Sequence, residues 1–82
     1  MDNTVVEYHI RKLHVGKLVR VINKWKKSNN IQCTVIIGFI SVSIHNLSKA
    51  IIYNLKQYLE INHPQLIYSI VNSKTTITIY AK

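Results

Sequence analysis

The sequence has few of the residues that crosslink, break or loosen a chain. Of its 82 residues, one is cysteine, one is proline and two are glycine. The single cysteine, Cys33, excludes an internal disulfide framework and a metal site built from four thiolates. Long flexible linkers need runs of glycine, proline or serine, and these are lacking as well. We therefore expect one compact domain over residues 1–82.

Acidic residues are scarce too, and they lie far apart. Asp2, Glu7 and Glu60 stand against 11 lysine and arginine residues, which gives a formal net charge of +8. General acid–base catalysis relies on paired titratable groups, and three scattered acids offer no such pair. The four histidines are also scattered, without the close spacing of metal ligands. We expect a protein that is not an enzyme and has no catalytic residues, no metal and no cofactor.

Long apolar runs are missing. The longest, residues 35–44, is interrupted by serine and is too short to cross the roughly 30 Å of hydrocarbon in a bilayer. The N-terminus carries acids and lacks the apolar segment of a secretory signal peptide. We expect a soluble intracellular protein of the cytoplasm, nucleoid or nucleus, with no membrane partner and no small-molecule substrate.

The first half of the chain changes its apolar period. Residues 4–10 alternate and are rich in β-branched types, which predicts a strand. Apolar residues then recur at helical spacing and predict a helix over 13–28. Residues 31–37 are apolar almost throughout, which predicts a strand buried on both faces in mid-sheet. Residues 38–44 are compatible with either a strand or an extended loop.

The second half predicts a helix followed by a hairpin. A helical apolar face begins near Leu47, with Asn46 or Ser43 as candidate N-caps, and ends before Pro64. Strands are expected over 65–71 and 75–81, joined by a short turn. The predicted fold is therefore α/β: a small two-layer domain in the order β-α-β-α-β-β, with a mixed four-stranded sheet and two helices.

The cations are concentrated in one segment. Seven of the 11 fall within residues 11–27. Four of these step by three, four and three residues, which places them on one helix face away from the apolar stripe: Lys17, Arg20, Lys24 and Lys27. A solvated helix face usually mixes in glutamate for i,i+4 pairs, and none occurs among them. The clustering favours a surface that contacts phosphate groups.

Other residue types give weaker signals. Most of the five tyrosines lie in apolar periodic segments, so we expect them in the core or at an interface. Phe39, after the second strand, is the candidate for stacking on a base. His14, between cations at the expected start of the first helix, is a candidate phosphate donor.

Three further features resemble one known family. Arg11 and Lys12 follow the first predicted strand, the segment 34–38 (TVIIG) leads through a loop to 47–51 (LSKAI), and a hairpin closes the chain. Together they resemble the Alba superfamily of small basic chromatin and RNA-binding proteins, which includes the Alba-type subunits of RNase P and MRP. The resemblance implies an Alba-like fold, and a homodimer or a heterodimer with a related subunit. It also implies contacts to the nucleic-acid backbone from Arg11, Lys12 and Lys74.

These observations predict a non-catalytic protein that binds DNA or structured RNA, largely independently of sequence, in chromatin or a ribonucleoprotein. The alternative is a small protein-interaction module, or a viral-type effector, whose basic face docks on an acidic protein. Whether the ligand is DNA or RNA, single- or double-stranded, is left open. The expected contact residues are Arg11, Lys12, His14, Lys17, Arg20, Lys24, Lys27 and Lys74.

Overall fold

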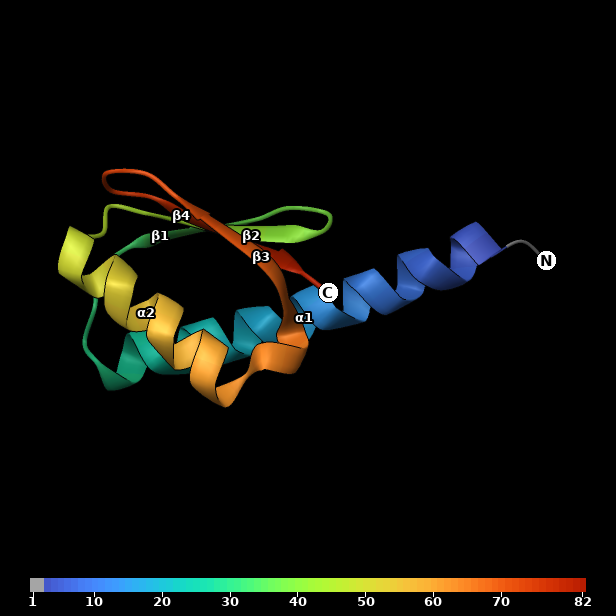
Figure 1. The fold of residues 1–82 in the computed structure, drawn as a ribbon, viewed down its shortest axis with the longest axis horizontal. Helices are drawn as coiled ribbons and strands as arrows, with labels where there is room; N and C mark the ends of the chain where they lie inside the picture. The colour runs from blue at the N-terminus through green and yellow to red at the C-terminus, as the bar shows by residue number, and fades with distance from the viewer. Residues whose placement is uncertain (1–2) are drawn as a thin grey trace.

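Two helices cover one face of a four-stranded sheet (Figure 1). The computed structural model describes the backbone from residue 3 onward and the side chains from residue 14 onward. The elements are α1 (Asn3–Ser28), β1 (Thr34–Ile37), β2 (Ser41–His45), α2 (Lys49–Asn62), the short 3-10 helix η1 (Pro64–Leu66), β3 (Ile67–Asn72) and β4 (Ile77–Ala81). The expected fold class, α/β with two helices on a four-stranded sheet, is confirmed.

The sheet is antiparallel throughout and has the order β1-β2-β4-β3. The expectation of a mixed sheet was wrong. The reason is the length of the connections, because residues 38–40 join β1 to β2 and residues 73–76 join β3 to β4. A parallel connection needs a crossover of a dozen or more residues, whereas these short loops allow only hairpins.

The strand expected at residues 4–10 was also wrong, because these residues belong to α1. Arg11 and Lys12 are good helix formers, and neither glycine nor proline separates them from the apolar stripe that follows. Extending an existing helix is much easier than nucleating a new one, so the helix continues through the β-branched segment. The remaining strand is β2, which lies in the segment that the sequence left open.

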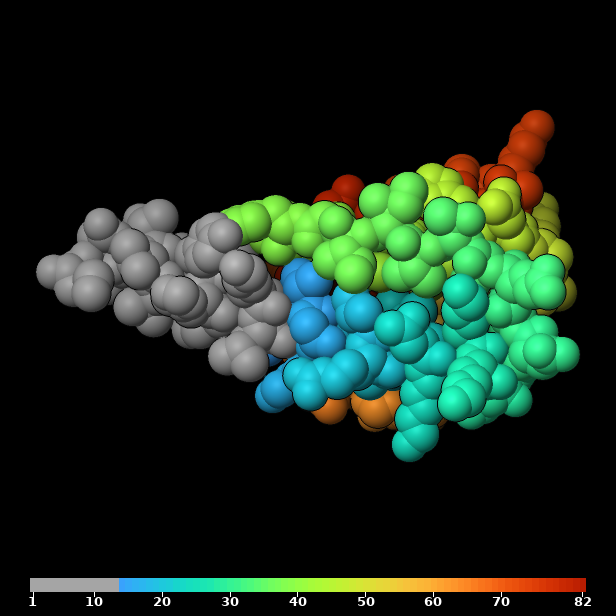
Figure 2. Space-filling model, turned by 180° about the vertical axis from the view of Figure 1, so that it is seen from behind, coloured from blue at the N-terminus to red at the C-terminus, as the bar shows by residue number. Residues whose placement is uncertain are grey.

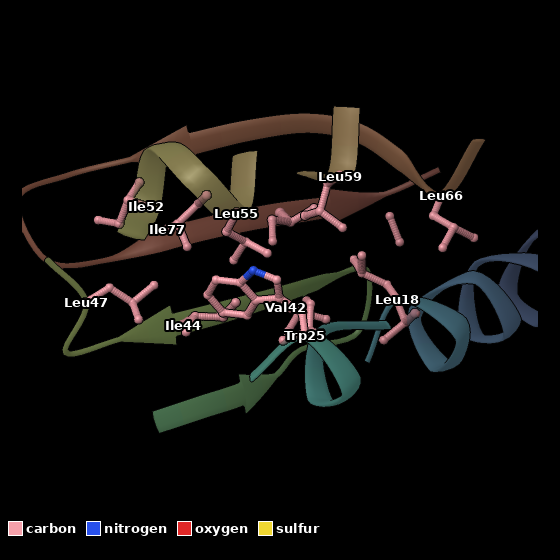
Figure 3. Packing of buried hydrophobic residues seen from close by; sticks show 14 residues of the cluster. Leu18, Trp25, Val42, Ile44, Leu47, Ile52, Leu55, Leu59, Leu66 and Ile77 are labelled. Carbon is pink, nitrogen blue, oxygen red and sulfur yellow. The ribbon is translucent and has the colours of Figure 1, made fainter. Parts of the chain in front are cut away.

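The core lies between the helices and the inner face of the sheet (Figure 3). The predicted stripe of α1 is confirmed, with Leu18 and Ile22 fully buried. In β2 and β4 every second side chain is buried, as expected for strands covered on one face only. The fully buried side chains are Leu18, Ile22, Val42, Ile44, Leu55, Leu59, Ile77 and Ile79.

The apolar strand β1 lies at the edge of the sheet and not in its middle. Ile36 is 53% exposed and Ile37 is 59% exposed, so the prediction of burial on both faces was wrong. Helices cover only the inner face, and the central positions are taken by β2 and β4, whose outward residues are serine, threonine, histidine or tyrosine. The apolar character of β1 is therefore left partly exposed.

Ser48 caps the start of α2. Its backbone is extended, and its Oγ accepts a hydrogen bond from the main-chain N–H of Ile51 at 3.3 Å. The two caps expected from the sequence were wrong, because Ser43 lies within β2 and Asn46 has a left-handed backbone with φ of 64°. The expected end of this helix before Pro64 is confirmed.

Replacing Ser48 with alanine is expected to lower the free energy of unfolding by about 1 kcal/mol, because one N-terminal N–H of α2 loses its acceptor. Urea unfolding followed by circular dichroism measures this loss. Ser73→Ala in the β3–β4 turn removes a hydroxyl from an exposed serine that caps no helix, and it should change stability by less than about 0.5 kcal/mol. Equal losses in the two variants would contradict the capping role of Ser48.

Candidate nucleic-acid interface

The exposed side of α1 carries a row of cations opposite its buried stripe. A helix turns about 100° per residue, so Lys17, Arg20, Lys24 and Lys27 fall within a sector of about 80°. All four are exposed, while Leu18 on the opposite side is fully buried. Figure 2 shows this part of α1, coloured blue to teal, along the surface below the green β1–β2 hairpin. We call these four residues the basic face of α1.

Little negative charge lies on this part of the protein. Within residues 14–82, nine lysine or arginine residues are present, and Glu60 on α2 is the only acidic residue. The basic face therefore has no carboxylate side chain among the described residues of its own helix. Lys26 and Lys27 lie in the last turn of α1, where the negative end of the helix dipole favours cations. That interaction offsets part of the repulsion within the basic face.

Two small hollows flank the basic face at the C-terminal end of α1. One has a volume of about 280 Å³ and is lined by Asn23, Lys26, Lys27, Asn30 and Ile31. Ammonium and amide groups donate hydrogen bonds to phosphate oxygens, so its lining suits a phosphate group or a sugar.

The second hollow lies between α1 and α2. It measures about 260 Å³ and is lined by Lys24, Trp25, Ser28, Asn29 and Tyr58. The asparagines of both hollows were not among the expected contact residues, although the run of Ser28, Asn29 and Asn30 beside the lysines was a usable signal. Tyr58 gave no such signal, because only the packing of α2 brings it beside α1.

Lys26 is directed away from the basic face. Its side chain is partly buried, and its Nζ donates to the main-chain carbonyl of Cys33 at 3.1 Å. This bond ties the last turn of α1 to the chain that leads into β1. Lys26 therefore contributes charge to the region, while its hydrogen bond is used within the fold.

Two of the other expected contact residues, His14 and Lys74, do not lie on the basic face. His14 was expected at the start of the first helix, but it lies inside α1. Its side chain is half-buried, and its Nδ1 donates to the main-chain carbonyl of Lys82. Arg11 and Lys12 also lie within α1, so the expected strand-to-helix corner does not exist, and their side chains lie outside the described residues. Lys74 is exposed in the β3–β4 turn of the sheet layer. Of the eight expected residues, the structure brings four together.

The outer face of the sheet has a different character. None of its four strands contains lysine or arginine. Its polar side chains bond to one another: Ser43 Oγ lies 3.1 Å from Thr78 Oγ1, and His45 Nδ1 lies 3.2 Å from Thr76 Oγ1. An uncharged surface of this kind does not attract phosphate groups, so the sheet and the basic face of α1 form two chemically distinct sides.

At one end of the sheet, two tyrosines line a hollow of about 520 Å³. A bulge between Ile67 and Ser69 accompanies the exposure of Tyr68, which is 77% exposed, and Tyr80 lies on the adjacent strand. Lys82 also lines this hollow. Aromatic rings stack on bases, and a neighbouring cation contacts the nucleic-acid backbone. Most of the tyrosines were expected in the core or at an interface; Tyr53 and Tyr68 are exposed and therefore lie outside the core, and nothing in the sequence marked the bulge.

Within residues 14–82 no group of three or more His, Cys, Asp or Glu side chains is placed to hold a metal ion. None of the helices that the structure describes has both the length and the apolar character to cross a membrane. Comparison of the chain with protein-family models, with curated proteins and with solved structures found no match. The resemblance to the Alba superfamily therefore stays a prediction.

Proposed function

We propose that this protein binds nucleic acid through the basic face of α1 and does not catalyse a reaction. The observation that supports this proposal is the grouping of four exposed cations on a helix whose opposite side is fixed in the core. Glu60 is the only acidic residue within residues 14–82, so few carboxylates of the described chain are present to balance these cations. A polyanion supplies the missing negative charge.

The length of the basic face suits a row of phosphates. Ten residues separate Lys17 from Lys27, which corresponds to about 15 Å along the helix axis. One strand of duplex DNA carries a phosphate about every 3.4 Å of its axis, so roughly four phosphates lie over that distance. Contacts to phosphate fix position and orientation but do not read the bases. Binding through this face is thus largely independent of sequence, as in chromatin or ribonucleoprotein particles.

The affinity is expected to fall steeply with salt, because each neutralised phosphate releases condensed counterions. Four contacts predict a slope of log K against log salt of about −3.6 for a duplex and about −2.8 for a single strand. Between 50 and 200 mM salt the affinity for duplex should fall by roughly 100-fold. Fluorescence anisotropy with labelled duplex DNA, structured RNA and single strands, at four salt concentrations, measures the slope and identifies the preferred ligand.

A slope near zero on every nucleic acid would contradict the proposal. Absence of binding at 50 mM salt, together with a stoichiometric complex with an acidic protein, would instead favour the protein-interaction alternative. Both outcomes use the same unmodified chain, so the comparison does not depend on any substitution.

A further inference from the structure

The outer edge of β1 is an unprotected sheet edge. β1 pairs only with β2 among the described strands, and the four residue pairs between them are in continuous register. Exposed edges are normally guarded by charged residues, proline or bulges. Residues 31–48 contain no Lys, Arg, Asp, Glu or Pro. The opposite edge strand, β3, has a bulge between Ile67 and Ser69.

The hydrogen bonds of the hairpin show which backbone groups of β1 are open. The N–H of Gly38 donates to the carbonyl of Ser41 at 2.7 Å, so this facing pair is a hydrogen-bonded one. Such pairs alternate along an antiparallel ladder. Thr34 and Ile36 therefore bond to β2, while the N–H and C=O groups of Val35 and Ile37 point to the open edge.

The open part of the edge is short and bounded at both ends. At one end, the next outward carbonyl, that of Cys33, accepts the hydrogen bond from Lys26 Nζ. At the other end, the turn begins at Gly38. Within β1 the open groups are thus two donors and two acceptors, on Val35 and Ile37. This set is symmetric about Ile36, so it is complementary to itself when a second strand runs antiparallel.

We propose that two copies of this chain pair through β1, antiparallel, about a two-fold axis at Ile36. In this register Val35 of each copy faces Ile37 of the other, and the two pairs exchange four hydrogen bonds. A second β1 in this register uses all the open donors and acceptors of the strand at once, because they are arranged symmetrically about Ile36. Ile36, which is 53% exposed, meets Ile36 of the second copy on the outer face of the sheet.

Apolar surface and charge favour the same pairing. On the helix side, Ile37 borders a hollow of about 580 Å³ whose lining is almost entirely apolar: Val15, Gly16, Val19, Ile37, Gly38 and Phe39. The second copy places its own Val35 and Ile37 beside this hollow. Two chains that each carry a net charge of +8 repel one another, and the segment 31–48, which contains no Lys or Arg, adds no cation of its own to the contact.

The pairing has a consequence for nucleic-acid binding that rests on the proposed function. A two-fold axis between antiparallel edge strands is perpendicular to the sheet, so the helices of both copies lie on the same side of one continuous sheet. The two basic faces of α1 then lie on one side of the dimer, which doubles the length of nucleic acid that a single particle contacts.

Oxidative crosslinking tests the register. In a Cys33→Ser background, Ile36→Cys places two thiols across a non-hydrogen-bonded pair, where the Cα atoms are about 4.5 Å apart and a disulfide fits. Val71→Cys is the matched control, because Val71 is 59% exposed on the other edge strand, β3. It lies on the same outer face of the sheet as Ile36: Val71 pairs with Thr78, Thr78 bonds to Ser43, and Ser43 pairs with Ile36. We expect a disulfide-linked dimer on a non-reducing gel for Ile36→Cys, at least tenfold more abundant than for Val71→Cys. Equal crosslinking of the two variants, or none, overturns the proposal.

Sedimentation equilibrium without nucleic acid gives a second, independent readout. Ile36→Lys places two like charges directly opposite each other at the axis, and it should weaken dimerisation at least tenfold. Val71→Lys adds the same charge to the other edge and should leave the dimerisation constant unchanged. A wild-type chain that stays monomeric at about 0.5 mM, or a dimer that Ile36→Lys does not weaken, overturns the pairing. Neither result depends on nucleic-acid binding.

Discussion

Replacing Lys24 and Lys27 with glutamine is expected to weaken binding to duplex nucleic acid by roughly 60-fold at 0.1 M salt. The slope of about −0.9 per phosphate contact means that each contact adds about 0.9 log units of affinity at 0.1 M salt relative to 1 M salt. Losing a contact removes that amount. Glutamine keeps most of the side-chain length and the helix propensity, so the fold is not disturbed. The slope of log K against log salt should fall by about 1.8 at the same time. Anisotropy titrations of the variant and the wild type measure both quantities.

The control is a pair of lysines on the other helix. Lys49 and Lys56 lie on α2, and their replacement with glutamine removes the same charge from the molecule. If binding depends on the basic face, this pair should lose less than about threefold in affinity. Equal losses in the two double variants would show that only the total charge matters, and would contradict a localised surface.

A third double variant tests the surface implied by the Alba resemblance. Arg11 and Lys12 also lie on α1, and we replace them with glutamine in the same way. A loss larger than that caused by the Lys24 and Lys27 pair would move the contact surface to the first half of α1. A smaller loss supports the basic face, where the structure finds four exposed cations in one sector.

The basic face was predictable from sequence because it depends on one helix alone. The apolar positions Leu18 and Ile22 fix which side of α1 is buried, and the helical period then places Lys17, Arg20 and Lys24 on the opposite side. No knowledge of the remaining fold is needed. The tyrosine hollow is different, because Tyr68 and Tyr80 meet only through the pairing of β3 with β4 and the bulge between them.

The position of β1 in the sheet was predicted wrongly because helices cover only one face of this sheet. A continuous apolar run indicates a central strand when helices cover both faces of a sheet. Here helices cover one face, so an alternating strand such as β2 takes a central position, with Val42 and Ile44 buried between outward serines. The apolar run in β1 lies at the edge instead, with Ile36 and Ile37 partly exposed. Sequence period alone does not tell how many faces a sheet buries.

The largest expected effect on stability is that of Leu18→Ala. Leu18 is fully buried where α1 packs on the sheet, and removing three carbon atoms leaves a cavity in a core that relaxes only partly. The free energy of unfolding should fall by about 3 kcal/mol, a large part of the roughly 4–12 kcal/mol expected for a domain of this size. Urea unfolding, monitored by the fluorescence of Trp25, measures the loss, because Trp25 is buried in the same cluster.

Ile61→Ala is the matched control, because it also removes three carbon atoms from a helix but at a side chain that is 71% exposed. Its effect should stay below about 0.5 kcal/mol. Leu18→Ala also separates stability from binding, since it leaves all four cations of the basic face in place. At temperatures where it remains folded, its affinity for nucleic acid should match that of the wild type. A 60-fold loss in Leu18→Ala would mean that binding follows global stability, and the loss expected from the Lys24 and Lys27 pair would then no longer identify a contact surface.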